Sequence, residues 1–269
     1  MLISCKVEGY NPTFPKEKQI AHRGYWNAGA LENSLQAVQY AIDAGLYGAE
    51  IDIHETKDGT VVVNHDDTYE GINIRLSSYQ EILDNTNADI PLFSDFLILI
   101  QKYPKFKLIV EIKTAYNIKS IIKLTEQYGV SSQIEFISFN KNYCEDIIQV
   151  NPEYKVGYLG YDLSPQYLAD KGYDIINSSY NFFISNPEII SEAYSLGLQV
   201  YTWTVNDAHL MSKMYNMGVL RITTDYPRYN NSDKISLLSF SINKISKLAR
   251  FKNIAADIPA GPDPIMITS

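Results

Sequence analysis

A regular alternation of short β-branched runs with amphipathic stretches is the feature of this sequence that most constrains its fold. Such alternation is typical of βα units built around a parallel sheet. The amphipathic stretches carry ordinary helix signals: Asn33–Ala44 ends at Gly45, Ile118–Gln127 ends at Gly129, and a helix starting at Asn186-Pro187 ends at Gly197. The runs predict strands at Gln19–His22, Ala49–His54, Val61–Asn64, Leu108–Ile112, Ile134–Ser138, Lys155–Leu159, Asp174–Asn177, Gln199–Thr204 and Arg221–Thr223.

About eight such units, with no Pro-, Gly- or Ser-rich linker between them, match the size of one closed (β/α)8 barrel, a TIM barrel. An open, doubly wound sheet is the alternative. That fold usually carries a Gly-rich phosphate loop after its first strand, whereas here the first strand ends in His22-Arg23-Gly24. We therefore expect a single α/β domain, a (β/α)8 barrel, over residues 1–229.

Residues 230–269 form a C-terminal extension, predicted as a helix followed by a Pro-containing tail. Apolar residues between Ile235 and Ile254 fall on roughly one helical face, with basic residues concentrated toward its end. Such a helix can lie on an anionic membrane, but packing on the barrel or on a second subunit is the commoner outcome. A homo-oligomer formed through this extension is one expectation.

Composition excludes several classes of partner. The formal net charge is −8 and the pI is about 5.0, which argues against nucleic-acid binding. Cys5 and Cys144 are far apart and belong to no Cys/His cluster, so no disulfide framework or thiolate zinc site is indicated. No apolar run approaches the length of a membrane span, and the N-terminus lacks a secretory apolar region, so we expect a cytoplasmic protein.

Polar side chains recur at the ends of the first four predicted strands, which is where barrel enzymes place their chemistry. Residues two apart in a strand point to the same face, so each acidic or basic pair on a strand is expected to face one way. The residues are His22 and Arg23, Glu50 and Asp52, His65 and Asp66, and Glu111 and Lys113.

Three carboxylates that face inward from neighbouring strands, Glu50, Asp52 and Glu111, would repel one another unless a cation lay between them. All-oxygen ligands favour one divalent cation, Mg²⁺ or Ca²⁺, with Mn²⁺ as a further candidate, over zinc. Arg23 and Lys113 beside this cation would bind a phosphoryl group. The sequence thus indicates a metal site that takes an anionic ligand.

Two histidines could complete a mechanism, because one imidazole can take a proton from a nucleophile while another protonates the leaving oxygen. His22 and His65 are the candidates for these roles. His54 shares the strand phase of Glu50 and either lines the site or has a structural role. His209 falls in a predicted helix and is expected at the surface.

Several motifs in order resemble those of the glycerophosphodiester phosphodiesterases, metal-dependent barrel enzymes akin to phosphatidylinositol phospholipases C. The resemblance runs from about residue 19 to 228, and the set is far more specific than any single motif. The motifs are Ala21-His22-Arg23-Gly24, Glu32-Asn33-Ser34, Gly48-Ala49-Glu50-Ile51-Asp52, Thr56-Lys57-Asp58-Gly59, His65-Asp66, Val110-Glu111-Ile112-Lys113, Tyr201-Thr202-Trp203-Thr204-Val205-Asn206 and Thr224-Asp225-Tyr226-Pro227.

The resemblance implies hydrolysis of a small-molecule glycerophosphodiester to glycerol phosphate and an alcohol, and it implies a role for each candidate residue. Trp203 would form an apolar wall for the glycerol or alcohol group, or else be a core residue of the barrel. Glu32 and Asn33 would hold neighbouring side chains in place. The other roles are acid and base for His22 and His65, metal binding for Glu50, Asp52 and Glu111, and phosphate binding for Arg23 and Lys113.

The sequence departs from the family after the His-Asp pair. The segment Asp67–Ile90 is short and lacks the Arg-Thr-Thr-like turn that helps to cover the substrate in relatives. A trimmed lid suggests an alcohol that is larger than, or different from, choline or ethanolamine.

Three other functions compete with this one. Attack by the substrate's own glycerol hydroxyl would end at a cyclic phosphate. The barrel could instead bind phosphate without catalysis, or the paired carboxylates could serve a carbohydrate hydrolase. The histidines and the two cations favour phosphodiester chemistry.

Overall fold

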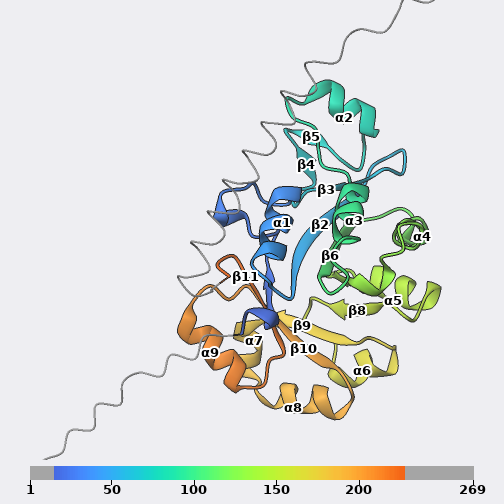
Figure 1. Cartoon of the computed structure of the whole chain (residues 1–269). Helices are drawn as coiled ribbons and strands as arrows, with labels where there is room; N and C mark the ends of the chain where they lie inside the picture. Colours follow the sequence, from blue (N-terminus) through green and yellow to red (C-terminus); the bar gives the residue numbers. More distant parts are fainter. Residues whose placement is uncertain (1–14, 228–269) are drawn as a thin grey trace, which may run out of the picture. The chain divides into compact units, whose positions relative to one another are not determined.

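A closed barrel of eight parallel strands forms the body of the computed structural model, which describes residues 15–227 (Figure 1). Each strand pairs with the next along the chain, and β11 pairs back with β1, so the predicted (β/α)8 fold is confirmed. The barrel strands are β1 (Gln19–Ala21), β2 (Gly48–Glu55), β6 (Lys107–Thr114), β7 (Ile134–Ser138), β8 (Lys155–Tyr158), β9 (Ile175–Ser179), β10 (Gln199–Trp203) and β11 (Arg221–Thr224).

Helices follow the strands and cover the outside of the barrel. The helix predicted at Asn33–Ala44 begins later, at Leu35, because Ser34 caps it by accepting a hydrogen bond from the Ala37 N–H. The helices are α1 (Leu35–Asp43), α2 (Tyr79–Asn85), α3 (Phe93–Ile100), α4 (Ile118–Gln127), α5 (Lys141–Val150), α6 (Pro165–Asp170), α7 (Tyr180–Ser185), α8 (Glu188–Ser195) and α9 (Ala208–Asn216).

Alternation along the strands separates two environments, as the sequence predicts. Glu50 and Asp52 on β2 stand in register with Ile109 and Glu111 on β6, and these four side chains share the inside of the barrel. The residues between them face outward, where Ile51, Ile53, Val110 and Ile112 are fully buried beneath the helices.

One strand that the sequence predicts for the parallel barrel is present but runs antiparallel. Val61–Val63 (β3) runs antiparallel to the end of β2, with Val63 opposite Ile53, so it forms a hairpin instead of a ninth parallel strand. The chain reverses in the turn at Thr56-Lys57-Asp58-Gly59, where Gly59 adopts a positive φ of 83°. The hairpin returns the chain to the carboxyl end of the barrel, where His65 follows.

The segment after this hairpin forms a small satellite of its own. It contains β4 (Thr68–Tyr69), β5 (Ile72–Asn73) and α2. Ile74, Ile82 and Ile90 pack with Val62 of β3 in a separate apolar cluster. The short 67–90 segment, which stands where relatives carry a longer lid, is therefore packed against β3 beside the barrel.

A buried carboxylate closes the amino end of the barrel. Glu135 on β7 is only 1% exposed, and it accepts hydrogen bonds from the hydroxyls of Tyr47, at 2.5 Å, and Tyr201, at 3.2 Å. Burial, and then the charge of Glu135, raises the pKa of Tyr47 to about 12. Lys155 Nζ lies 3.9 Å from the same carboxylate, and Arg221 stacks on the Tyr47 ring. This network is distant from the carboxyl end and serves the structure of the barrel floor.

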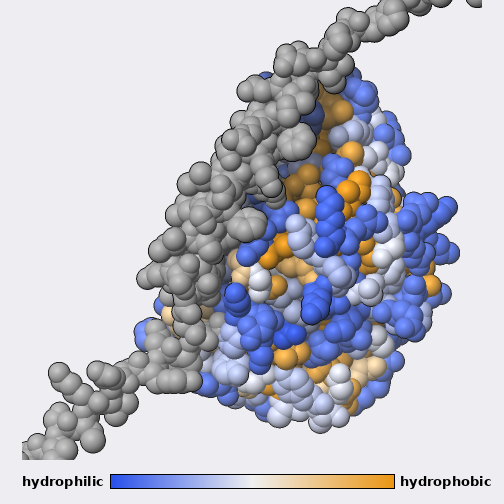
Figure 2. Space-filling view, viewed as in Figure 1, coloured by the Kyte–Doolittle hydropathy of each residue, from blue (hydrophilic) through white to orange (hydrophobic). Residues whose placement is uncertain are grey.

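No helix within residues 15–227 is long and apolar enough to cross a membrane. The face drawn in Figure 2 carries hydrophobic residues in small groups among hydrophilic ones. The C-terminal extension, with its expected helix at Ile235–Ile254 and its expected role in oligomerisation, lies outside the described residues.

Removing one donor from the barrel floor should destabilise the fold. Tyr201→Phe leaves one oxygen of Glu135 without its tyrosine donor, so we expect the free energy of unfolding to fall by about 1–3 kcal/mol. Urea denaturation followed by circular dichroism measures this change. Tyr161→Phe, at a highly exposed tyrosine, is the control and should change stability by less than about 0.5 kcal/mol; equal effects of the two substitutions would contradict the structural role of the network.

Candidate active site at the carboxyl end of the barrel

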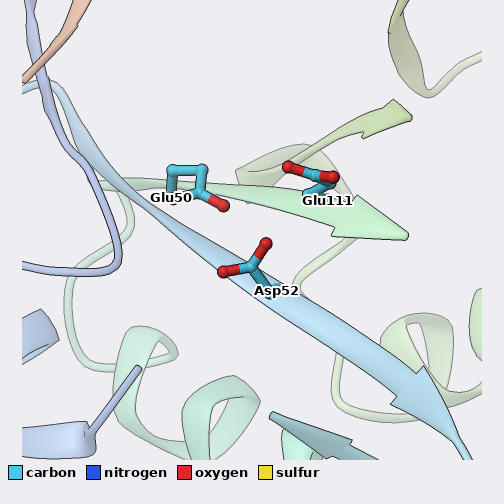
Figure 3. A group of neighbouring side chains, drawn as sticks. All are labelled: Glu50, Asp52 and Glu111. Atoms are coloured by element: carbon cyan, nitrogen blue, oxygen red, sulfur yellow. The ribbon is translucent and has the colours of Figure 1, made fainter. Parts of the chain in front are cut away.

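Three carboxylates converge inside the barrel near its carboxyl end. Glu50 and Asp52 come from β2 and Glu111 from the neighbouring β6, and one oxygen from each lies within 4.8 Å of the others. Figure 3 shows their carboxyl groups turned toward a common space. The in-register pairing of Asp52 with Glu111 produces this convergence, because side chains at the same level of adjacent parallel strands are neighbours.

The electrostatics of this cluster fit a divalent cation. Burial raises the pKa of Glu50 well above its usual value, and repulsion from Asp52 and Glu111 raises it further. Burial and the charge of Asp52 likewise raise the pKa of Glu111. Oxygen Oε1 of Glu50 is buried and accepts no hydrogen bond from the described residues. A hard cation would satisfy this oxygen and relieve the repulsion, so the three residues could hold Mg²⁺, Ca²⁺ or Mn²⁺.

The turn after β1 brings Arg23 against these carboxylates. Its backbone N–H donates to Oε2 of Glu50 at 2.8 Å, and its guanidinium donates to Glu32 at 2.7 Å. Arg23 itself has a φ of 54°, in the left-handed region. Gly24 follows with a φ of 79°, and a Cβ there would lie 2.6 Å from the Cβ of Ala37, so glycine lets the turn pack on α1.

Asn33 orients Asp52 by two hydrogen bonds. Its side-chain amide donates to Oδ2 of Asp52 at 2.9 Å, while its Oδ1 accepts from the Asp52 backbone N–H at 3.0 Å. Asn33 is buried and lies outside the helix that the sequence predicts for it, with a φ of 55°. Neither Glu32 nor Asn33 lines the cavity described below. Glu32 contacts Arg23, and Asn33 contacts Asp52.

His22 pairs with an acidic residue that follows β11, the strand that closes the barrel next to β1. Its Nδ1 lies 2.7 Å from Oδ1 of Asp225, which follows β11, and Asn206 donates to the other oxygen of Asp225 at 2.6 Å. Burial raises the pKa of Asp225, but the hydrogen bonds from His22 and Asn206 outweigh it, so this pKa lies below its usual value. The Nε2 of His22 is then free to face the cavity, 4.0 Å from Glu50 Oε2.

His65 reaches the cavity through the β2–β3 hairpin. Its Nδ1 pairs with Asp66 at 2.7 Å, a hydrogen bond that lowers the pKa of Asp66. The carbonyl oxygen of His65 lies 3.4 Å from Nε2 of His54. His54 is buried, which lowers its pKa, and its Nδ1 lies 3.0 Å from the hydroxyl of Thr114. His54 thus supports the segment that carries His65 and does not line the cavity.

Lys113 extends from β6 on the same face as Glu111. Its Nζ lies 3.0 Å from Glu111 and 3.8 Å from Asp52. Burial acts to lower the pKa of Lys113, but the two carboxylates outweigh this effect and raise it. Lys113 therefore carries its positive charge beside the cluster.

A cavity of about 220 Å³ joins these groups to an apolar wall. On the wall, the Trp203 indole donates to the Asn177 carbonyl oxygen at 3.2 Å and packs edge-on against Phe139, with 5.6 Å between ring centroids. Trp203 is thus partly exposed to the cavity and is not a fully buried core residue. The lining residues are His22, Arg23, Glu50, His65, Glu111, Lys113, Ile137, Phe139, Leu159, Asn177, Trp203, Thr204 and Thr223.

The barrel therefore brings together all of the side chains that the sequence singled out for chemistry, while His209 is exposed on α9 as expected. No role was predicted for Asp225 or Asn206, although Asp225 directly follows β11 and Asn206 lies three residues after β10. Their position at two adjacent strand ends was the signal that could have identified them.

Comparison with known proteins agrees with this architecture. A model of the glycerophosphoryl diester phosphodiesterase family matches residues 22–229. A glycerophosphodiester phosphodiesterase of Caldanaerobacter subterraneus is 28% identical over 232 residues, covering 77% of this chain and 93% of that protein.

Solved structures are similar over the whole barrel. A glycerophosphodiester phosphodiesterase of Parabacteroides distasonis superposes with a TM-score of 0.75 at 31% identity, covering 84% of this chain and 98% of the other. A phosphodiesterase of Oleispira antarctica in complex with the product sn-glycerol-3-phosphate shares the fold, with a TM-score of 0.68 at 24% identity and coverage of 78% and 93%. The match of the family model to most of the barrel, together with these relatives, shows that the chain belongs to the glycerophosphoryl diester phosphodiesterase family.

Proposed function

We propose that this protein hydrolyses a glycerophosphodiester to glycerol phosphate and an alcohol, using one divalent cation and acid-base catalysis by two histidines. The observation that carries the proposal is one cavity lined by two cationic side chains, two imidazoles and the carboxylates of Glu50 and Glu111, which form a cluster with the buried Asp52. Membership of the family supports the same reaction.

Glu50, Asp52 and Glu111 would hold the cation, and Asn33 would fix the orientation of Asp52. When bound, the cation supplies Lewis-acid polarisation of the phosphoryl group. Arg23 is held beside the cluster by Glu32, so its guanidinium is already positioned for a phosphoryl oxygen. Lys113, on β6, adds a second positive charge beside Glu111.

His22 and His65 would act as the general base and the general acid. In each, Nδ1 is engaged by a carboxylate, Asp225 or Asp66, which fixes the ring and leaves Nε2 for the substrate. One imidazole takes the proton from the attacking hydroxyl, and the other donates a proton to the departing alcohol oxygen. Attack by the glycerol hydroxyl of the substrate would pass through a cyclic phosphate before hydrolysis.

The apolar wall would bind the carbon skeleton of the substrate. Trp203 and Phe139 both line the cavity and pack edge-on against each other. No residue of the 67–90 segment is among those that line the cavity. The absence of this segment from the cavity lining supports the expectation that the alcohol differs from choline or ethanolamine, or is larger.

Loss of either catalytic histidine should abolish most activity. We expect His22→Ala and His65→Ala each to lower kcat for glycerophosphocholine or another cleaved diester by about 10²–10⁴-fold, the usual contribution of a positioned acid or base. His209→Ala, on the exposed surface of α9, is the matched control and should keep wild-type kcat.

The products of the same reactions test the route. Phosphorus NMR should detect glycerol phosphate as the final product, whereas a cyclic phosphate that accumulates and persists would establish the lyase-like alternative. Full activity of His22→Ala would remove this residue from the mechanism.

Removal of one carboxylate should weaken metal binding. Glu111→Gln takes away a charged ligand without changing its shape, so we expect the affinity for Mg²⁺, Ca²⁺ or Mn²⁺ to fall by at least about tenfold. Isothermal titration calorimetry measures this affinity independently of activity, and EDTA should abolish hydrolysis by the wild-type protein. Glu126→Gln, on α4 outside the cluster, should bind the cation as the wild type does; an equal loss in both variants would refute the proposed ligand set.

A further inference from the structure

Asn177, on β9, lines the catalytic cavity with a side chain to which the proposed mechanism gives no part. The residue is only 1% exposed, and its Oδ1 is buried and accepts no hydrogen bond from residues 15–227. Its backbone is engaged, because it pairs with Tyr201 across the β9–β10 ladder and its carbonyl oxygen accepts from the Trp203 indole. A buried amide oxygen without a partner costs stability, so its presence in a cavity calls for an explanation.

Buried polar atoms without a partner concentrate in this cavity. Within residues 15–227, five buried side-chain nitrogen or oxygen atoms lack a hydrogen bond, and three of them belong to residues that line the cavity. These three are Nε of Arg23, Oε1 of Glu50 and Oδ1 of Asn177. Phosphate binding by Arg23 and cation binding by Glu50 would satisfy the first two. The same reasoning assigns a ligand group to Asn177.

The surroundings of Asn177 are apolar. Ile137 and Leu159 line the cavity and also belong to the hydrophobic cluster of the barrel interior, so they form the floor of the cavity. Ile175, two residues before Asn177 on the same face of β9, belongs to that cluster as well. These side chains offer no hydrogen bond to the amide. A hydrogen bond from a ligand would be strengthened there by the apolar surroundings.

Asn177 lies across the barrel from the carboxylates. From β2, the strand β9 is reached through β6, β7 and β8 in one direction and through β1, β11 and β10 in the other, so the two strands are opposite. The cavity between them measures about 220 Å³. Pockets for drug-sized ligands measure roughly 300–1,000 Å³, so the group enclosed here is small. A substrate with its phosphoryl group at the carboxylate side would extend a small adjoining group toward Asn177.

We propose that Asn177 is a specificity-determining residue that hydrogen-bonds the terminal hydroxyl of the glycerol group, so that the glycerol end of the diester lies at the floor and the alcohol end at the mouth. This inference rests on the proposed function, since it adds a contact within the same site. The phosphoryl oxygens of a diester and the quaternary ammonium of choline have no hydrogen to donate to Oδ1. A hydroxyl can donate to Oδ1 and also accept from the amide nitrogen.

The two free hydroxyls of the glycerol group have different positions relative to the phosphorus. The central hydroxyl would be the attacking group on the cyclic route, so it must stay beside the cation and the base. The terminal hydroxyl is one carbon further away and is free in either route. With this end held at the floor, the alcohol at the mouth can change in size without altering the contacts of Asn177. The orientation therefore agrees with the expectation of a larger or different alcohol.

The test pairs two substrates with two variants. The kcat/KM of the full-length protein is measured on glycerophosphocholine and on an analogue in which CH₃ replaces the terminal CH₂OH group. Asn177→Leu replaces the amide by an apolar group, and Asn177→Ala removes it and leaves the space open. Asn142→Leu, at an exposed asparagine on α5, is the control. Thermal unfolding of each variant reports on stability separately.

We expect the wild type and the control to prefer glycerophosphocholine over the analogue by about tenfold or more, and both Asn177 variants to lose this preference, because the same hydrogen bond is then absent for both substrates. The ratio is insensitive to a general loss of activity. The melting temperature of Asn177→Leu should not fall, since an unpaired buried oxygen gives way to an apolar group.

Three outcomes would overturn the inference. The first is a wild type that does not distinguish the two substrates, and the second is a preference that survives in both Asn177 variants. The third is a selective loss of activity on glycerophosphoethanolamine relative to glycerophosphocholine in these variants. That loss would place the primary ammonium of the alcohol end at Asn177 instead of the glycerol hydroxyl.

A binding measurement separates failure of this inference from failure of the proposed function. Isothermal titration calorimetry with glycerol phosphate and with its terminal deoxy analogue, each with Mg²⁺ present, should show the same preference and its loss in both Asn177 variants. If the wild type hydrolyses no diester, the proposed function is wrong and calorimetry alone decides the role of Asn177. If it hydrolyses glycerophosphocholine while the variants keep the preference, the function stands and the role of Asn177 is refuted.

Discussion

Repulsion among three carboxylates, two of them buried and the third half-buried, is the constraint on which the rest of the catalytic end depends. Parallel pairing in register places Asp52 beside Glu111, and the alternation of β2 adds Glu50 to the same interior face. The surrounding residues stabilise this negative charge through the backbone N–H of Arg23, the side-chain amide of Asn33 and the ammonium of Lys113. These contacts are incomplete, since one buried oxygen of Glu50 has no hydrogen bond. The proposed divalent cation would balance the negative charge that these contacts leave.

The two ends of the barrel show how the same type of residue serves stability or chemistry. Glu135, at the floor, receives two tyrosine hydroxyls and lies near a lysine, so its burial is compensated within the fold. Glu50 is buried to a similar extent but retains an unpaired oxygen and a raised pKa. Uncompensated burial of a carboxylate costs stability, and it persists where binding of a ligand recovers the cost. The partners of each glutamate thus distinguish the structural end from the functional end.

Much of this division could be predicted from the sequence, because period-two alternation and strand ends are local properties. The barrel, the inward pair Glu50 and Asp52 and the helix Ile118–Gln127 were all predictable in this way. The antiparallel course of β3 was not, since a three-residue valine run has no periodicity that distinguishes a parallel strand from a hairpin. The partnership of His22 with Asp225 depends on barrel closure between β1 and β11, about two hundred residues apart in sequence. Asn33 lies before the helix, in a left-handed backbone conformation, and its side chain makes two hydrogen bonds with Asp52.

The exposed hydrophobic residues of the βα connections are harder to predict from sequence patterns, because they belong to loops and share no spacing. Leu31 and Leu76 are hydrophobic residues in polar surroundings, and a sequence alone predicts their burial. Only the closed barrel brings the connections after β1 and β2 to one face, where both leucines are exposed. The same closure that gathers the carboxylates in the interior therefore gathers hydrophobic side chains on the rim.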